Sequence, residues 1–139
     1  MMEYITGIHA LNLPCKLDTC GDWHSTSIQW EHPNTLESSN SIFGDYGIEK
    51  NKQISFLNPK INYNVANHIR ALLDLMYLNK LGIVQGMRDN YICNDNYTIE
   101  IFQKVIMMKH CNNWNEIDNL MSDEYKMQWI KFKRGEFYD

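Results

Sequence analysis

The sequence has no long hydrophobic run and no excess of basic residues. No stretch approaches the roughly 18–20 apolar residues of a membrane-spanning helix, so we expect no membrane span. The N-terminus, MMEYITGIHALNLPC, has no basic region followed by a long apolar stretch, so we expect no secretory signal and a cytosolic location. The net charge of −4 at pH 7 lacks the basic footprint that non-specific binding to nucleic acid or anionic membranes requires. A membrane or nucleic-acid partner is therefore not expected.

The common catalytic and phosphate-binding motifs are absent as well. The chain contains no P-loop, no G-x-G-x-x-G, no H-E-x-x-H and no C-x-x-C. An enzyme built on one of the familiar scaffolds usually carries one such motif. Their absence favours a protein that binds a partner over one that catalyses a reaction.

What is present is the composition of an ordinary globular domain. The chain has 139 residues, of which 44% are hydrophobic, 12% aromatic and 22% charged. This length is typical of a single domain, and this apolar share is enough for a buried core. We therefore expect one domain over residues 1–139.

The two halves of the chain differ in pattern. Residues 1–60 are rich in turn-forming residues, with short apolar pieces that are candidate strands at 4–8, 27–30 and 54–57. Residues 61–139 instead show helical periodicity. The expected fold class is α+β, with an irregular β-rich N-terminal half packed against three or four C-terminal helices.

The strongest helical pattern follows Asn58-Pro59 and ends near Gly82. Its apolar positions Val65, Ile69, Leu72 and Met76 recur at the spacing of one buried face, so this helix is expected to begin near residue 62. Arg70 and Asp74, four residues apart, are then expected on the solvent side as a surface pair that contributes about 0.2–0.5 kcal/mol. Further helices are expected over 97–109, after Asn113 and from Ser122.

A metal site is one interpretation of the N-terminal cysteines and histidines. His9, Cys15, Cys20 and His24 form the pattern H-x5-C-x4-C-x3-H, and two cysteines with two histidines are a suitable tetrahedral set for zinc. The spacing differs from the common zinc knuckle, however. The alternative is that the cysteines are small buried side chains, so no cofactor is favoured and zinc is kept as a possibility.

A catalytic interpretation centres on Asp22-Trp23-His24. On a strand, Asp22 and His24 point to one face, where the carboxylate can fix the imidazole tautomer and raise its basicity. Asp45, in FGDYGIE, is the third candidate catalytic residue. The alternative is that Asp22 and His24 bond backbone groups in a tight turn, while Asp45 is an exposed loop acid.

Three further residues are candidates for binding: Trp23, Tyr46 and Arg70. A guanidinium forms bidentate contacts with phosphate or carboxylate, so Arg70 is a potential anchor for either group. His68, at the edge of the same helical face, is expected to be a hydrogen-bonded boundary histidine and not a ligand.

The segments HALNLPCKLDTCGDWH, SIFGDYGIE and HIRALLDL together resemble a family of small, poorly characterised proteins of bacteria and mobile elements. The resemblance covers residues 5 to about 133. It implies an antitoxin or accessory partner encoded beside a nucleotidyltransferase-like toxin of the abortive-infection type, and it assigns no catalytic role. The sequence as a whole leaves three hypotheses open: a cytosolic protein-interaction module, a small hydrolase or nucleotide-modifying enzyme that uses Asp22 and His24, and a small structural zinc protein.

Overall fold

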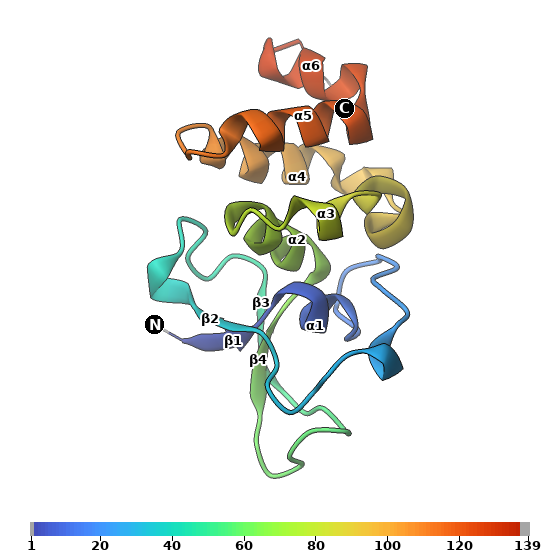
Figure 1. Ribbon diagram of the computed structural model, residues 1–139, viewed down its shortest axis with the longest axis vertical. Helices are drawn as coiled ribbons and strands as arrows, with labels where there is room; N and C mark the ends of the chain where they lie inside the picture. The colour runs from blue at the N-terminus through green and yellow to red at the C-terminus, as the bar shows by residue number, and fades with distance from the viewer. Residues whose placement is uncertain (1, 137–139) are drawn as a thin grey trace.

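The computed structural model, described here for residues 2–136, places a small sheet at one end and the C-terminal helices at the other (Figure 1). The sheet has the strand order β2-β1-β4-β3, with antiparallel pairs at both edges and a parallel pair, β1 and β4, in the middle. The strands are β1 (Glu3–Ile5), β2 (Thr35–Glu37), β3 (Ile48–Lys52) and β4 (Tyr63–Ala66). The expected α+β class is confirmed.

Helices account for most of the remaining regular structure. The α-helices are α1 (Gly7–Leu11), α2 (His68–Tyr77), α3 (Leu81–Val84), α4 (Thr98–Val105), α5 (Trp114–Tyr125) and α6 (Met127–Lys133). A π-helical turn, η3 (Met87–Ile92), and the 3-10 turns η1 (Ser25–Ser27), η2 (Ser38–Asn40), η4 (Asp95–Tyr97) and η5 (Ile106–Met108) connect them. No helix within residues 2–136 is long and apolar enough to cross a membrane.

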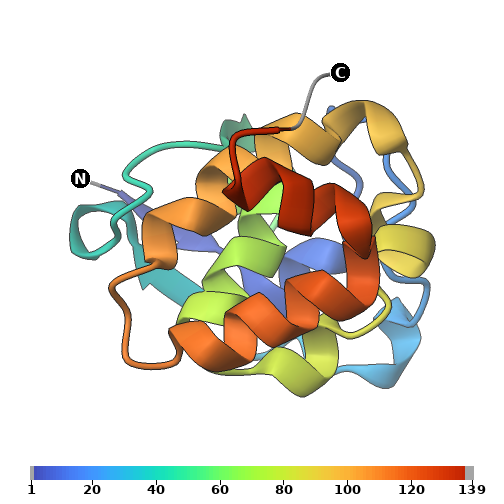
Figure 2. The same cartoon turned by 90° about the horizontal axis from the view of Figure 1, so that it is seen from above.

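Helix α2 lies at the centre of the molecule, between the sheet and the layer formed by α4, α5 and α6 (Figures 1 and 2). Every residue from His68 to Met76 is buried, and only Tyr77, the last residue of the helix, is exposed. Burial on all sides overturns the expected solvent position of Arg70 and Asp74, which are 0% and 2% exposed. The amphipathic pattern failed here because the charged pair faces protein groups instead of water.

The start of this helix also differs from the expected one. Val65 belongs to β4, where it pairs with Ile5 of β1, so the helix begins at His68 and not near residue 62. The Asn67 side chain accepts a hydrogen bond from the Arg70 backbone N–H and so caps the helix. At the other end, Asn79 adopts a left-handed conformation, and the helix stops before Gly82.

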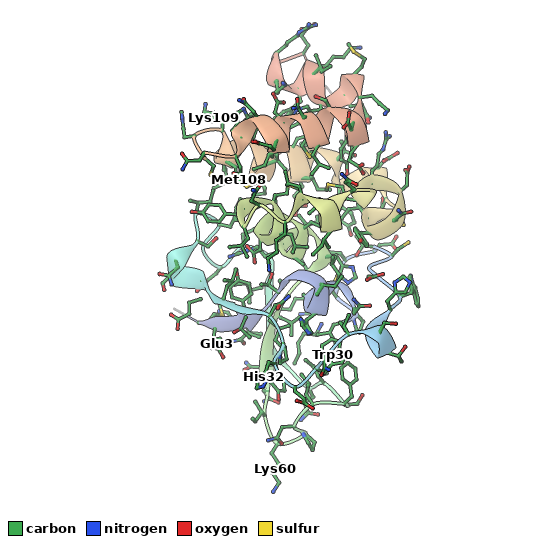
Figure 3. All side chains as sticks on the ribbon, in the orientation of Figure 1. Glu3, Trp30, His32, Lys60, Met108 and Lys109 are labelled. Atoms are coloured by element: carbon green, nitrogen blue, oxygen red, sulfur yellow. The ribbon has the colours of Figure 1, made fainter. Side chains whose placement is uncertain are left out.

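Two of the three expected strands are not strands. Ser27 is the last residue of the turn η1 and residues 28–30 follow it, while residues 54–57 lie in the long connection between β3 and β4, whose tip carries Lys60 (Figure 3). The edge strands that do form, β2 and β3, have the sequences TLE and IEKNK and are only partly buried. Such short polar edges carry little of the alternation that identifies a strand in a sequence.

The C-terminal helices are held together by an aromatic cluster. The Phe102 ring lies 5.0 Å from the ring centroid of Tyr125 and 5.2 Å from that of Trp129, both edge-on.

Helix α5 continues through Ser122, where a new helix was expected, and ends at Lys126, whose φ of 57° breaks the chain direction before α6. The helix expected over 97–109 is confirmed as α4 followed by η5.

Candidate functional site

The loop over residues 13–24 folds against the N-terminal end of α2 and borders a cavity of about 370 Å³ that is open to solvent. We call this space the loop cavity. The size falls within the range of small-molecule sites. Its walls include Leu11, Cys15, Thr19, Asp22, Trp23 and His68.

Asp22 and His24 meet on one side of this loop. The Nδ1 atom of His24 lies 2.5 Å from Oδ1 of Asp22, and because a carboxylate only accepts, this nitrogen carries the proton. Asn12 braces the pair, donating to Asp22 Oδ2 at 3.2 Å and accepting from the His24 backbone N–H at 2.8 Å. His24 thus turns Nε2 away from Asp22, with a side chain that is 71% exposed.

The charge of Asp22 is stabilised by this arrangement. Burial alone raises the pKa of the Asp22 carboxyl, but hydrogen bonds from His24, Asn12 and the Trp23 backbone N–H lower it by more, so the net pKa lies below its ordinary value. The structure therefore contains both features considered for this segment: an Asp–His contact suited to acid–base chemistry, and a tightly bonded turn.

Asp45 does not join this pair. It lies exposed in the 41–47 turn segment and is not among the residues that line the loop cavity. Within residues 2–136, its carboxylate forms no hydrogen bond or ion pair. The structure brings together two of the three candidate catalytic residues and leaves the third apart.

Trp23 projects from the rim of the loop cavity and is 82% exposed. The backbone on which it sits is well anchored, because the Gly21 N–H donates to the Tyr91 carbonyl at 2.8 Å and the Asp22 N–H donates to the Leu11 carbonyl at 2.7 Å. This hydrogen-bonded loop therefore keeps a large aromatic side chain exposed to solvent.

A second, smaller and mainly apolar cavity of about 140 Å³ adjoins the first, with Leu13 and Pro14 lining both. Phe56, 52% exposed, borders this second cavity and packs edge-on against Trp30, with 4.6 Å between ring centroids. Trp30 lies near the sheet end of the molecule (Figure 3), where its indole N–H donates to the Ser25 carbonyl at 2.8 Å. We call the two cavities with Trp23, Trp30 and Phe56 the Trp23 face.

Of the candidate zinc ligands, His9 is already occupied by hydrogen bonds to the backbone. His9 is buried, its Nε2 donates to the Gln29 carbonyl at 2.6 Å, and its Nδ1 accepts from the Asn34 backbone N–H at 3.0 Å. Both ring nitrogens are therefore engaged by the backbone. Among the described residues, no three His, Cys, Asp or Glu side chains lie in a metal-binding arrangement, and Cys15 and Cys20 are free thiols. Zinc binding stays a prediction without geometric support from His9.

His68 is buried at the first turn of α2, hydrogen-bonded as expected, but it also contacts a residue pair that sequence reasoning missed. Its Nε2 lies 2.8 Å from the Leu13 carbonyl and its Nδ1 lies 2.6 Å from the Thr19 hydroxyl. The Thr19 hydroxyl in turn lies 3.6 Å from the Cys15 thiol. No local motif joins Cys15 to His68, because β2, β3, β4 and their connecting loops lie between the two residues in the sequence.

Arg70 and Tyr46, expected to bind a partner, make internal contacts instead. Arg70 donates to the carbonyls of Gly44 and Tyr46 at 2.8 and 2.6 Å, to the Tyr4 hydroxyl at 2.8 Å and to Asp74 at 3.0 Å. This buried guanidinium ties the 43–47 turn and β1 to α2.

Tyr46 is half-buried, and its hydroxyl donates to the Glu100 carboxylate of α4. The ring of Tyr46 also lies under the Lys104 ammonium group, 4.2 Å from the ring centroid. Of the three candidate binding residues, only Trp23 is free to meet a partner in this structure.

No family model, curated protein or solved structure matches the chain.

Proposed function

We propose that the chain is a cytosolic protein-interaction module that binds an extended segment of a partner protein across the Trp23 face. The observation that carries the proposal is the 82% exposure of Trp23 on a hydrogen-bonded loop. Tryptophan is enriched among the residues that dominate binding energy, and an anchor held in place before binding loses little entropy on association.

The form of the Trp23 face supports an extended occupant. The two cavities share Leu13 and Pro14 and are bordered by exposed aromatic side chains, Trp23 on the first and Phe56 on the second. A peptide that crosses the shared wall can place one side chain against Trp23 and an apolar side chain in the smaller cavity. Exposed aromatic side chains gathered beside cavities are typical of a protein-binding site.

The partner we propose is a nucleotidyltransferase-like toxin of the abortive-infection type, for which this chain acts as antitoxin or accessory subunit. The resemblance of the HALNLPCKLDTCGDWH, SIFGDYGIE and HIRALLDL segments suggests this class of partner. The net charge of −4 is compatible with it, because an acidic protein is attracted to a basic nucleotide-handling cleft.

The test is co-expression of the chain with such a toxin encoded beside it, followed by co-purification and calorimetric titration of the purified pair. Trp23→Ala is expected to weaken binding by about 2 kcal/mol or more, which is about 30-fold in Kd, and to abolish protection from the toxin. Since Trp23 is exposed, the same substitution is expected to change the free energy of unfolding by no more than about 0.5 kcal/mol.

Met127→Ala is the matched control, since Met127 is 52% exposed but lies at the start of α6, outside the Trp23 face. It is expected to bind the toxin as the unmodified chain does. The proposal is wrong if the unmodified chain neither binds nor neutralises the toxin, or if Trp23→Ala binds with unchanged affinity.

A second candidate function, a small hydrolase or nucleotide-modifying enzyme, is favoured by the 2.5 Å contact between Asp22 and His24. A carboxylate on Nδ1 leaves the other ring nitrogen able to accept a proton from water or a hydroxyl group. With bis(p-nitrophenyl) phosphate as the probe, hydrolysis is expected to fall about 100-fold or more in His24→Ala. The exposed His32 provides the control, and equal rates for His24→Ala and His32→Ala would exclude this function.

A further inference from the structure

Cys15, Thr19 and His68 form a hydrogen-bonded chain that opens on the loop cavity. The Leu13 carbonyl can only accept, so the His68 Nε2 atom at 2.8 Å carries a proton and donates it. In the neutral ring, Nδ1 is then the acceptor for the Thr19 hydroxyl at 2.6 Å. With its proton directed at His68, the Thr19 oxygen accepts from the Cys15 thiol at 3.6 Å. The order of donation is Cys15 to Thr19 to His68.

The hydrogen-bonded series Cys15–Thr19–His68 has the arrangement of a nucleophile that is activated by a base. His68 is only 3% exposed, whereas Cys15 is half-buried, so the base is shielded while the sulfur lines a cavity open to a small molecule. Transfer of one proton from Cys15 to Thr19 and of another from Thr19 to His68 Nδ1 produces a thiolate and an imidazolium. A thiolate paired with a protonated histidine is the reactive form of nucleophilic cysteines.

The electrostatics of the pair agree with this layout. Burial alone raises the pKa of the Cys15 thiol, but its interactions with His68 and Thr19 lower it by more, so the net pKa lies below the ordinary value of 9.0. Burial alone lowers the pKa of His68, but its interactions with Cys15, the Leu13 carbonyl and the Glu49 carboxylate raise it by more. Each partner therefore favours the charged form of the other.

Three other charged groups, Glu49, Lys52 and Asp22, face this region. Glu49 accepts from the Lys16 backbone N–H at 2.7 Å and is paired with Lys52, also at 2.7 Å. Asp22 lies on the wall of the loop cavity, where its negative charge disfavours an anionic ligand. The apolar walls, Leu11, Leu13 and Pro14, suit an uncharged hydrocarbon group.

We propose that Cys15 is the nucleophile of an acyl-transfer site that takes a small, uncharged ester or thioester, with Thr19 relaying protons between Cys15 and His68. The Cys15 sulfur forms a bond to the carbonyl carbon, the bond from that carbon to the leaving oxygen or sulfur breaks, and the leaving group receives the proton from His68 Nδ1 through Thr19. Water then attacks the acyl-cysteine, its proton passes to His68 through Thr19, and the departing Cys15 sulfur regains a proton as the carboxylic acid leaves. The inference does not depend on the proposed interaction function.

The first test uses p-nitrophenyl acetate as the probe, with the intact chain and mass spectrometry of its peptides. Acetylation is expected at Cys15, with loss of the fast phase of p-nitrophenolate release in Cys15→Ser and its retention in the controls Cys20→Ser and Cys93→Ser. Acetylation of Cys20 or Cys93 ahead of Cys15, or a fast phase that survives in Cys15→Ser, would overturn the proposal.

The second test separates activation by His68 from simple exposure of the thiol. The pKa of the Cys93 thiol is raised to about 11, first by burial and then by hydrogen bonding with Cys20, whereas the pKa of the Cys15 thiol is lowered, so Cys15 has more thiolate at neutral pH. Because a less basic thiolate is less nucleophilic, iodoacetamide is expected to alkylate Cys15 about tenfold faster than Cys93.

Thr19→Val keeps the size of the side chain but removes the relay, so it is expected to move the midpoint of the Cys15 alkylation profile to higher pH and to slow acetylation about tenfold or more. Far-ultraviolet circular dichroism verifies that this variant is folded. Unchanged alkylation and acetylation of Cys15 in folded Thr19→Val would show that no relay operates.

Discussion

The Nε atom of Arg70 donates to the Asp74 carboxylate at 3.0 Å in the interior of the protein. The other oxygen of Asp74 accepts from the hydroxyls of Tyr4 and Thr6, both at 2.7 Å. The guanidinium also lies 4.9 Å from the ring centroid of Tyr4 and 5.6 Å from that of Phe43. This charged pair connects the sheet, the 43–47 turn and the central helix, so it belongs to the architecture of the core.

Asp74→Ala is expected to destabilise the chain by about 3–5 kcal/mol, because it leaves the Arg70 charge buried without a counter-ion. Urea unfolding at neutral pH gives the change in the free energy of unfolding. Asp95→Ala is the matched control, since Asp95 pairs with Arg88 at 3.2 Å on the surface and is expected to contribute about 1 kcal/mol or less. Similar losses in the two variants would contradict the structural role assigned to the buried pair.

The buried tyrosines predict a loss of stability at alkaline pH. Burial, as the largest cause, raises the pKa of both Tyr4 and Tyr125 well above the ordinary value of 10.0. The folded chain therefore binds more protons than the unfolded chain above about pH 10, so the free energy of unfolding falls as pH rises further. Urea midpoints measured between neutral pH and pH 11 are expected to decline above pH 10.

Tyr125→Phe keeps the aromatic packing and removes one ionisable hydroxyl, so it is expected to make this alkaline decline shallower. Tyr77→Phe serves as the control, because it removes the same hydroxyl from a tyrosine that is exposed at the end of α2. An identical alkaline decline in Tyr125→Phe, Tyr77→Phe and the unmodified chain would refute the assignment.

Periodicity located the helices better than the strands. The pattern around Ile69, Leu72 and Met76 identified α2, because tertiary packing favours the same apolar face that the sequence displays. It misplaced Arg70 and Asp74, since a charged pair that is satisfied by groups distant in sequence has no local signature. Strands β2 and β3 were not predicted for a related reason. They form because they pair with β1 and β4, and their own residues show no strand pattern.

The candidate site shows the same division between local and distant contacts. Asp22 and His24 were paired correctly because they lie two residues apart in one turn. The Cys15–Thr19–His68 chain required the loop to return to the start of α2, a contact that spans 49 residues from Thr19 to His68. A single sequence carries no local signal for such a contact, so the sequence predicts no contact between Cys15 and His68.

The close approach of Gly21 to His68 predicts that the loop tolerates no side chain there. A Cβ at Gly21 would lie 2.6 Å from His68 Cε1 and 2.7 Å from the Leu11 carbonyl oxygen, at a φ of +67°. Gly21→Ala is therefore expected to cost about 1–2 kcal/mol for the left-handed backbone and about 1–3 kcal/mol more for the steric conflict. It is also expected to slow alkylation of Cys15, because the loop must move away from His68.

Gly44→Ala isolates the backbone contribution. Gly44 has a φ of +53°, and a Cβ there meets nothing within 4 Å, so only the left-handed cost of about 1–2 kcal/mol is expected. Urea unfolding and iodoacetamide alkylation of the two variants then distinguish the terms. Equal destabilisation in both, with Cys15 alkylation unaffected by Gly21→Ala, would mean that the loop does not depend on contact with His68, and the geometry of the Cys15–Thr19–His68 chain would lose its support.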